Sequence, residues 1–221
     1  MIYAAAAVGY LLGSIPVGLL VGWLAGKDVR HEGSGNIGFT NVLRVCGLAW
    51  GLPVLLLDLA KGFAPAFWIA PALVDRSGTF AAVLAGLAAI LGHNFPVWLR
   101  FRGGKGVATS AGAVLALMPE AFGVALVTWA GMVGLTRYVS VGSMSAGVAL
   151  LIAHLVLSPT PFGGNDLPLT VLAVVLCGLV VVRHKGNIQR LRAGTENRIG
   201  ASAIRGNEDV ASQAPEGKRD A

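Results

Sequence analysis

Long apolar runs recur along this 221-residue chain, and short polar segments separate them. An apolar run of roughly 17–25 residues is long enough to cross the hydrocarbon core of a bilayer as a helix. Only 13% of the residues are charged, compared with about 25% in globular domains. The sequence therefore predicts an all-α membrane protein. Six clear helices are expected near residues 3–25, 46–72, 79–99, 120–136, 138–157 and 167–183, and a shorter apolar run covers 107–118.

The positions of the lysines and arginines indicate how many of these runs cross the membrane. Basic residues gather in the segments that stay on the cytoplasmic side. Seven crossings, with Met1 outside, place every cation on that side except Lys61, within a helix, and Arg76, in an outer loop. Six crossings would put one group of cations on the wrong side. We therefore expect seven transmembrane helices, with the N-terminus outside and the C-terminus cytoplasmic. The cation-bearing segments are 26–45, 100–106, 137 and 183 onward.

Other features narrow the class of protein. Residues 1–204 are predicted to form one integral membrane domain, and the polar residues 205–221 a disordered cytoplasmic tail. A net charge of +6 would suit a nucleic-acid-binding protein, but the cations are spread over short inter-helix segments, so no nucleic-acid partner is expected. The four histidines show no ligand spacing and there is no Cys/His cluster, so neither a metal nor another cofactor is expected.

The first polar cluster, Ser34-Gly-Asn36-Ile-Gly-Phe-Thr40-Asn41-Val-Leu-Arg44, follows the first apolar run. We interpret it as a loop that offers backbone and side-chain donors, and Arg44 can hold a phosphate through two parallel hydrogen bonds. The alternative is a Gly/Asn-rich turn whose arginine only anchors the topology. Composition alone favours neither interpretation.

The second polar cluster is a Gly-Gly-Lys-Gly loop at residues 103–106. Glycines around a cation allow backbone N–H groups to turn toward one oxyanion, such as phosphate. The Walker spacing is absent and no hydroxyl residue follows Lys105, so a nucleotide triphosphatase is not expected. His93, before the loop, is either a general base or a hydrogen-bonded capping residue, and the structural role is favoured. Pro96 is expected to bend or end the preceding helix.

The third polar cluster begins where the last apolar run ends and contains His184, Asn187, Arg190 and Glu196. If this segment is helical, His184 and Asn187 share a face. The alternative is a basic segment that binds anionic lipid headgroups, which suits Arg190 better than the other three residues. With seven crossings, all three clusters fall on the cytoplasmic face of the membrane.

Two further polar features lie in or beside apolar runs. Asp58 and Lys61 are three residues apart within a helix, where charges are usually paired and face inward. We expect a structural ion pair here rather than a proton relay. Ser140 and Ser143 stand at the cytoplasmic start of another helix, where hydroxyls either satisfy the backbone or contribute to an anion site.

Together these motifs resemble the acyl-phosphate-dependent glycerol-3-phosphate acyltransferases, the PlsY family of bacterial membrane enzymes. Their order along the chain matches the family, and the resemblance covers residues 1 to about 200. Arg102 stands where the family commonly has lysine, so the charge is kept. The matching stretches are Gly13–Gly18, Ser34–Arg44, Gly92–Thr109 and His184–Glu196.

The resemblance implies the transfer of a fatty acyl group from acyl phosphate to the 1-hydroxyl of glycerol 3-phosphate, giving lysophosphatidate and phosphate in phospholipid biosynthesis. It also implies a multi-pass protein of the bacterial inner membrane with its active site on the cytoplasmic face. The expected partners are the two substrates, membrane lipids and an enzyme that forms acyl phosphate. The expected catalytic residues are Ser34, Lys105, His184 and Asn187. The substrate-binding set is Ser34, Asn36, Thr40, Asn41, Arg44, His93, Gly103, Gly104, Lys105, Gly106, Ser143, His184 and Asn187, while Asp58, Lys61 and Glu196 are structural.

Two substrates that both carry phosphate require two anion sites close together. Because acyl phosphate is already activated, the protein is expected to contribute mainly positioning and charge stabilisation, with His184 as a general base as the rival mechanism. From another class, a small organic-phosphate transporter is the alternative, although transporters often show repeats and a midplane site. We expect Ser34, Arg44, Lys105 and Ser143 to bind glycerol 3-phosphate, the N–H groups of Gly103, Gly104 and Gly106 to hold acyl phosphate, and His184 and Asn187 to orient the reacting groups.

Overall fold

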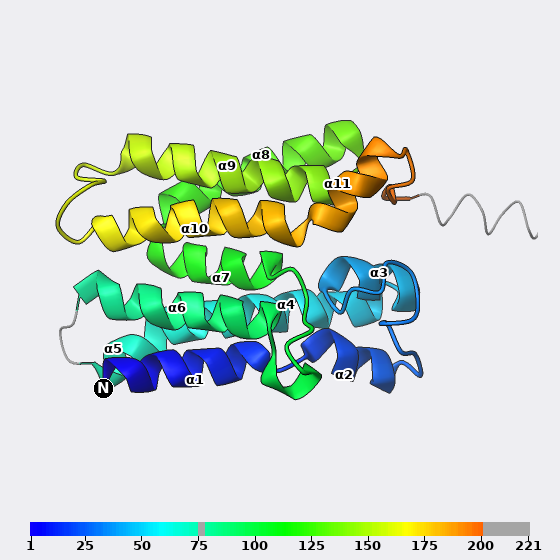
Figure 1. Ribbon diagram of the computed structural model, residues 1–221, viewed down its shortest axis with the longest axis horizontal. Coiled ribbons are helices and arrows are strands. Elements are labelled where there is room, and N and C mark those ends of the chain that lie inside the picture. Colours follow the sequence, from blue (N-terminus) through cyan, green and yellow to red (C-terminus); the bar gives the residue numbers. More distant parts are fainter. Residues whose placement is uncertain (75–77, 201–221) are drawn as a thin grey trace, which may run out of the picture.

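The structure is a computed structural model that describes residues 1–74 and 78–200. Within these residues all regular secondary structure is helical (Figure 1). Arg76 of the predicted outer loop and the predicted tail at 205–221 lie outside the described residues. The helices are α1 (Ile2–Ser14), α2 (Val17–Leu24), α3 (Phe39–Cys46), α4 (Leu48–Ala64), the π-helix η1 (Pro65–Ile69), α5 (Ala70–Leu73), α6 (Gly78–Asn94), the 3₁₀-helix η2 (Val97–Leu99), α7 (Val107–Leu117), α8 (Pro119–Thr136), α9 (Val139–Leu157), α10 (Leu167–Arg183) and α11 (Lys185–Arg192).

Every apolar run predicted from the sequence is helical in the structure. Five helical stretches of the described chain are long and apolar enough to cross a membrane. A sixth is obtained if α10 and α11, which meet at a bend of 52°, count as one span. Helix α7 is apolar but has only 11 residues, so the seventh crossing stays a prediction. The five stretches are Ile2–Leu24, Leu48–Leu73, Gly78–Leu99, Pro119–Thr136 and Val139–Leu157.

The first apolar run is two helices, where the sequence predicted one. Helix α1 ends at Ser14 and α2 begins at Val17, because Pro16 lacks the N–H group that would continue the backbone ladder. The Ile15 carbonyl at this break accepts a hydrogen bond from Lys61 Nζ of α4 at 2.9 Å. A lysine thus satisfies a helix end that lies within an apolar bundle, where unpaired backbone groups are costly.

The ion pair predicted between Asp58 and Lys61 is present, and it has a third member. Lys61 Nζ lies 2.9 Å from Asp58 Oδ1, and both side chains are buried. His93, near the end of α6, places its Nδ1 atom 3.5 Å from the same oxygen. The cluster therefore connects α4 with both the α1–α2 break and the end of α6, two contacts that the sequence did not predict.

Small residues allow the helices to pack closely. A Cβ atom on Gly62 of α4 would lie 1.9 Å from the carbonyl oxygen of Thr109 on α7, so only glycine fits at this crossing. The largest apolar core lies where α6 to α10 meet and includes Ile90, Leu150 and Leu172. This packing fixes α7 in the middle of the bundle, with its first residue at the same end as α3 and α11 (Figure 1).

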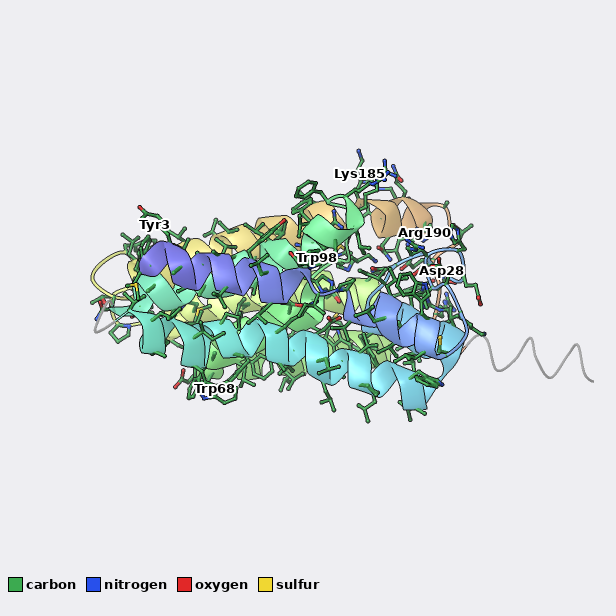
Figure 2. All side chains as sticks on the ribbon, turned by 90° about the horizontal axis from the view of Figure 1, so that it is seen from below. Tyr3, Asp28, Trp68, Trp98, Lys185 and Arg190 are labelled. Carbon is green, nitrogen blue, oxygen red and sulfur yellow. The ribbon has the colours of Figure 1, made fainter. Side chains whose placement is uncertain are left out.

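The polar clusters gather at one end of the molecule. The helices run roughly side by side along its long axis, with the N-terminus at one end and α11 at the other (Figure 1). Asp28, Lys185 and Arg190 lie toward the α11 end, whereas Tyr3 and Trp68 lie toward the opposite end (Figure 2). The three clusters expected to share one face of the membrane are thus brought to the same end of the bundle.

Removal of Lys61 alone should destabilise the protein more than removal of both members of the ion pair. In Lys61→Met the Asp58 carboxylate stays buried without its main partner, which costs about 3–5 kcal/mol. The double variant Asp58→Asn, Lys61→Met carries no uncompensated charge at this site, so we expect it to recover part of the loss. Thermal unfolding of the purified protein in detergent measures the ranking, and a double variant less stable than Lys61→Met would contradict it.

Candidate functional site

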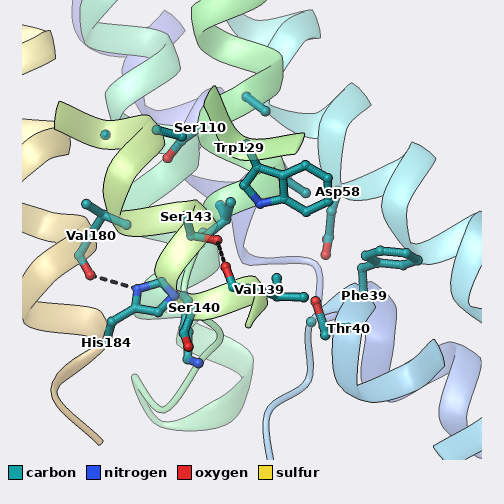
Figure 3. A pocket seen from close by; sticks show the side chains of 18 of the residues that line it. Phe39, Thr40, Asp58, Ser110, Trp129, Val139, Ser140, Ser143, Val180 and His184 are labelled. Carbon is teal, nitrogen blue, oxygen red and sulfur yellow. Dashed lines mark hydrogen bonds between the residues drawn. The ribbon is translucent and has the colours of Figure 1, made fainter. Parts of the chain in front are cut away.

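A cavity of about 480 Å³ lies at the end of the bundle that carries the polar clusters (Figure 3). Its walls come from α3, α4, α6, α7, α8, α9 and α10, from the loops before α3 and α7, and from the segment that follows α10. Residues that are far apart in the sequence therefore meet around one space. Of the predicted binding residues, those that line it are Ser34, Asn36, Thr40, Asn41, Arg44, His93, Lys105, Gly106, Ser143, His184 and Asn187.

The first polar cluster is only partly a loop. Helix α3 begins at Phe39, so Thr40, Asn41 and Arg44 stand on a short helix, which corrects the loop expected from the sequence. The helix forms because its one fully buried apolar residue, Val42, packs into the apolar core that joins α2, α3 and α4. Sequence composition is a poor guide here, because the segment is held in place by this tertiary contact rather than by a long apolar period.

Asn41 shapes the loop that precedes α3. Its Nδ2 group donates to the carbonyl oxygens of Val29 and Glu32 at 2.9 and 3.1 Å, and its Oδ1 atom accepts a hydrogen bond from the Ser34 N–H group at 2.7 Å. The amide of Asn41 is therefore occupied, and its contribution is to hold Ser34 at the cavity.

The Arg44 guanidinium is available to an anion. It is half-buried, and its nearest hydrogen-bond partner is Asn41 Oδ1 at the long distance of 3.4 Å. No carboxylate of the described residues forms an ion pair with it. Burial lowers the pKa of Arg44 from its usual value, although an arginine stays charged at any physiological pH. A desolvated and unneutralised guanidinium favours an anionic ligand.

The Gly-Gly-Lys-Gly loop differs from the prediction in which of its N–H groups are free. The N–H groups of Gly103 and Gly104 donate to the carbonyl oxygens of Asn94 and His93 at 3.2 and 3.1 Å. Neither glycine lines the cavity. The predicted role of these two N–H groups as phosphate donors is therefore wrong for this conformation, because they fasten the loop to the end of α6.

Free N–H groups follow directly after these two glycines. In the described part of the chain, no carbonyl or side chain accepts a hydrogen bond from the N–H groups of residues 105–109. Gly106 has a φ of 76°, a left-handed conformation that glycine adopts without strain, and this turns the chain into the start of α7. Lys105, Gly106, Val107 and Ala108 all line the cavity. A helix N-terminus with unpaired N–H groups is suited to an anion.

Lys105 is held by a chain of hydrogen bonds. Lys105 Nζ donates to Asn187 Oδ1, and Asn187 Nδ2 donates to Glu196 Oε1. The Glu196 carboxylate also accepts hydrogen bonds from Ser140 Oγ and Arg190 Nε, each at 2.8 Å. Burial opposes the ionisation of Glu196, but these hydrogen bonds hold its pKa below the usual value. Glu196 therefore links α9, α11 and the lysine loop through these hydrogen bonds.

Positive charge exceeds negative charge around Lys105. Burial lowers the pKa of Lys105 to about 8, and the charges of Arg190, Arg44 and Arg183 act in the same direction, while Glu196 opposes them. Around Lys105, the charge of one carboxylate, Glu196, is thus opposed by the charges of three arginines and the lysine itself. A dianionic ligand would neutralise this excess and raise the pKa of Lys105.

The hydrogen bond of the His184 side chain identifies its tautomer. His184 Nδ1 lies 2.7 Å from the Val180 carbonyl oxygen, which can only accept, so Nδ1 carries the proton and Nε2 has a free lone pair. Figure 3 shows His184 on the same side of the cavity as Ser140 and Ser143. Burial and the nearby Lys105 charge lower the pKa of His184 to about 4. At neutral pH His184 is therefore an uncharged imidazole with an acceptor atom at the cavity.

Ser143 and His93 are more constrained than the sequence suggested. Ser143 Oγ donates to the Val139 carbonyl oxygen one turn earlier at 2.9 Å, so its lone pairs face the cavity as acceptors. His93 is buried beside Asp58, and a Cβ atom on Gly104 would lie 2.2 Å from its Nε2 atom. The structural alternative for His93 therefore fits its surroundings better than a general base.

The deeper wall of the cavity is apolar, and the sequence alone did not identify the residues that form it. Leu56 of α4 and Leu126 of α8 line the cavity and are also exposed on the outer surface of the bundle. In the sequence such residues are indistinguishable from those that face lipid or core, because each belongs to a continuous apolar run. The cavity is thus suited to an amphiphile, with an anion among the polar residues and a chain along the helices. Further apolar lining residues are Leu55, Val114, Phe122, Trp129, Leu150 and Leu176.

Among the described residues there is no group of three or more His, Cys, Asp or Glu side chains arranged to hold a metal ion. The residues that line the cavity offer cations, backbone N–H groups, hydroxyls, carboxylates and the imidazoles of His93 and His184.

Comparisons with known proteins point to one family. The sequence profile of the family described as glycerol-3-phosphate acyltransferase matches residues 3–194. A protein of that name from Symbiobacterium thermophilum is 47% identical over 201 residues, covering 90% of this chain and 94% of its own. A second, from Shouchella clausii, is 48% identical over 198 residues, covering 87% and 93%.

Two solved structures share the fold. The crystal structure of PlsY (YgiH), an integral membrane glycerol 3-phosphate acyltransferase, in its glycerol 3-phosphate form superposes with a TM-score of 0.83 at 37% identity and covers 92% of this chain and 98% of that one. The lysophosphatidic acid form of the same protein gives a TM-score of 0.79 and covers 90% and 95%.

Anion binding at the cavity should weaken as pH rises through about 8, the pKa to which burial lowers Lys105. Below this pH the lysine is charged and binding has its full strength, whereas above it the ammonium loses its proton. We expect the Kd for sulfate, which does not itself titrate in this range, to rise by up to about tenfold per pH unit above pH 8.

Lys105→Arg is the matched control for this pH dependence, because arginine stays charged and should give a Kd that is flat up to pH 10. Isothermal titration with sulfate at pH 6 to 10 measures both proteins. Equal slopes would show that another group governs the pH dependence.

Proposed function

Because the chain belongs to the glycerol-3-phosphate acyltransferase family, we propose that it transfers a fatty acyl group to the 1-hydroxyl of glycerol 3-phosphate with acyl phosphate as the donor. The products are lysophosphatidate and phosphate. The observation that carries the proposal is the cavity, in which unneutralised cations and free N–H groups adjoin an apolar channel. An acyl phosphate has the same two parts, a dianionic head and a long apolar chain.

Two phosphate sites are proposed within the cavity. Arg44 and the Lys105 side chain, with Ser34 and Ser143, would hold the phosphate of glycerol 3-phosphate. The free N–H groups of residues 105–109 would hold the phosphate of the acyl donor, in place of the Gly103 and Gly104 donors expected from the sequence. Both sites share Lys105, so the two substrates would be bound side by side. Charge-assisted hydrogen bonds from such groups are about twice as strong as neutral ones.

The acyl transfer needs little acid help. The glycerol 3-phosphate hydroxyl oxygen forms a bond to the carbonyl carbon of the donor, and the bond from that carbon to the phosphate oxygen breaks. The hydroxyl proton passes to a phosphate oxygen or, by the rival mechanism, to His184 Nε2. Phosphate is a good leaving group, so positioning and charge stabilisation are the main contributions of the protein. A pKa of about 4 makes neutral His184 a weak base, which favours an orienting hydrogen bond from the hydroxyl to Nε2.

The proposed setting is the bacterial inner membrane. Seven crossings, with the N-terminus outside and the cavity at the cytoplasmic face, agree with the basic residues at the cavity end. Because acyl phosphate is unstable and insoluble relative to glycerol 3-phosphate, an enzyme that forms it is the expected functional partner. The organic-phosphate transporter considered from the sequence is not supported, since the chain is similar to acyltransferases over nearly its whole length.

The deciding experiment supplies purified protein in detergent or lipid with acyl phosphate and glycerol 3-phosphate. We expect release of inorganic phosphate and formation of lysophosphatidate in equal amounts, both of which require both substrates. Phosphate release without glycerol 3-phosphate would indicate hydrolysis, and absence of both products would end the acyltransferase proposal. Lys105→Met, which removes the charge shared by the two sites, is the matched inactive variant.

His184→Ala separates the two mechanisms. General-base catalysis typically contributes about 10²- to 10⁴-fold, so loss of a base would lower kcat by that amount and leave KM nearly unchanged. We expect a smaller fall, together with a rise in KM for glycerol 3-phosphate, because His184 only orients the hydroxyl. His184→Gln keeps an acceptor and should recover part of the loss. A kcat for His184→Gln as low as that of His184→Ala would favour the general base.

A further inference from the structure

Arg183, the last residue of α10, contacts the lysine loop from outside the cavity. Its Nη2 group donates to the carbonyl oxygens of Gly103 and Gly104 at 3.0 and 2.6 Å, and its Nε group donates to Gly104 at 3.2 Å. Its guanidinium also lies over the ring of Phe95, 5.2 Å from the centroid. Arg183 does not line the cavity. It is thus fixed on both sides, by the loop and by an aromatic face.

The direction of these carbonyl groups determines the direction of the next N–H group. The peptide bond between Gly104 and Lys105 is trans, and in a trans peptide the C=O and N–H bonds point in opposite directions. Since the Gly104 carbonyl points at Arg183, the Lys105 N–H group points away from it. Lys105 lines the cavity while Arg183 does not. These contacts of Arg183 with the Gly103 and Gly104 carbonyls, which we call the clamp, therefore keep the Lys105 N–H group on the side of the peptide opposite Arg183.

The same contacts keep two carbonyl oxygens away from the anion site. A carbonyl oxygen that faced the cavity would repel a phosphate, and glycine permits the peptide rotation that would bring it there. From the other side, the Gly103 and Gly104 N–H groups donate to the end of α6. The loop is therefore fastened to α6 by its N–H groups and to α10 by its carbonyl groups.

We propose that Arg183 is a positioning residue for the anion site, which holds the Gly103 and Gly104 carbonyls so that the free N–H groups of residues 105–109 face the bound phosphate. This inference rests on the proposed function only in taking the ligand to be a phosphate. Arg183 touches neither substrate, and its effect passes through the loop backbone. Lysine at this position offers one nitrogen in place of the planar fork and can hold the two carbonyls less well.

The test compares Arg183→Gln and Arg183→Lys with Arg192→Gln. Arg192 is exposed on α11, at the same end of the protein. Arg192→Gln therefore removes the same charge as Arg183→Gln. We expect Arg183→Gln to raise the Kd for inorganic phosphate and the KM for acyl phosphate by about 10- to 100-fold. Arg183→Lys should recover part of this loss, and Arg192→Gln should change both constants by less than about threefold. Isothermal titration measures the Kd, and initial rates give KM and kcat.

Hydrogen exchange provides a second measurement that does not depend on turnover. In the presence of phosphate, the N–H groups of residues 105–109 should be protected in the wild type and in Arg192→Gln, and less protected in Arg183→Gln. A phosphate Kd for Arg183→Gln equal to that of Arg192→Gln would overturn the inference. So would a loss of thermal stability in Arg183→Gln with unchanged Kd and KM, because that result would assign Arg183 a purely structural role.

The outcomes for this inference and for the proposed function are separable. If the wild type binds phosphate but makes no lysophosphatidate, the acyltransferase proposal fails while the Kd series still tests the clamp. If the wild type is active and the phosphate Kd is the same in the wild type and in the Arg183 variants, the proposed role of Arg183 fails and the acyltransferase proposal stands.

Discussion

The bilayer does not tolerate unpaired backbone groups, and this constraint explains where the site lies. Five consecutive N–H groups, those of residues 105–109, have no acceptor among the described residues. In contact with lipid each would cost several kcal/mol. Within a cavity they can be satisfied by water or by an anion. The chain reaches the first residue of α7 through the glycine loop, and the start of this helix lines the cavity.

The sequence predicted the helices and the convergence of the polar clusters, because both follow from long-range patterns. Apolar runs define the helices, and the distribution of cations placed Arg44, Lys105 and His184 on one face. It could not predict details that depend on tertiary contacts. Helix α3 forms because Val42 is buried, and the Gly103 and Gly104 N–H groups bind the end of α6. Arg183 contacts the same loop through backbone carbonyl groups, which every residue carries, so no sequence pattern marks this contact.

Glu196 shows how one carboxylate can order a basic site without neutralising it. It accepts hydrogen bonds from Ser140, Asn187 and Arg190, and through Asn187 it fixes the position of Lys105. A second carboxylate beside these cations would have lowered the excess of positive charge and reduced the attraction for phosphate. With Glu196 as the one carboxylate in this hydrogen-bond network, the side chains are held in place and an excess of positive charge is left for an anionic ligand. One carboxylate among three arginines and a lysine thus orders the site and still leaves the positive charge that favours an anion.

The boundary between the polar and apolar parts of the cavity determines where the reaction can occur. In an acyl phosphate the carbonyl carbon lies between the anionic head and the apolar chain, so a site that binds both parts must hold this carbon at the boundary. Lys105 and the N–H groups after it define the polar side, and Val114 and Leu150, further along α7 and α9, define the apolar side. His184 directly follows α10 and lines the same cavity as the start of α7. Under the proposed function, the acceptor hydroxyl approaches this carbon from the polar side, where the cations would hold its own phosphate, and this arrangement suits a small phosphorylated alcohol.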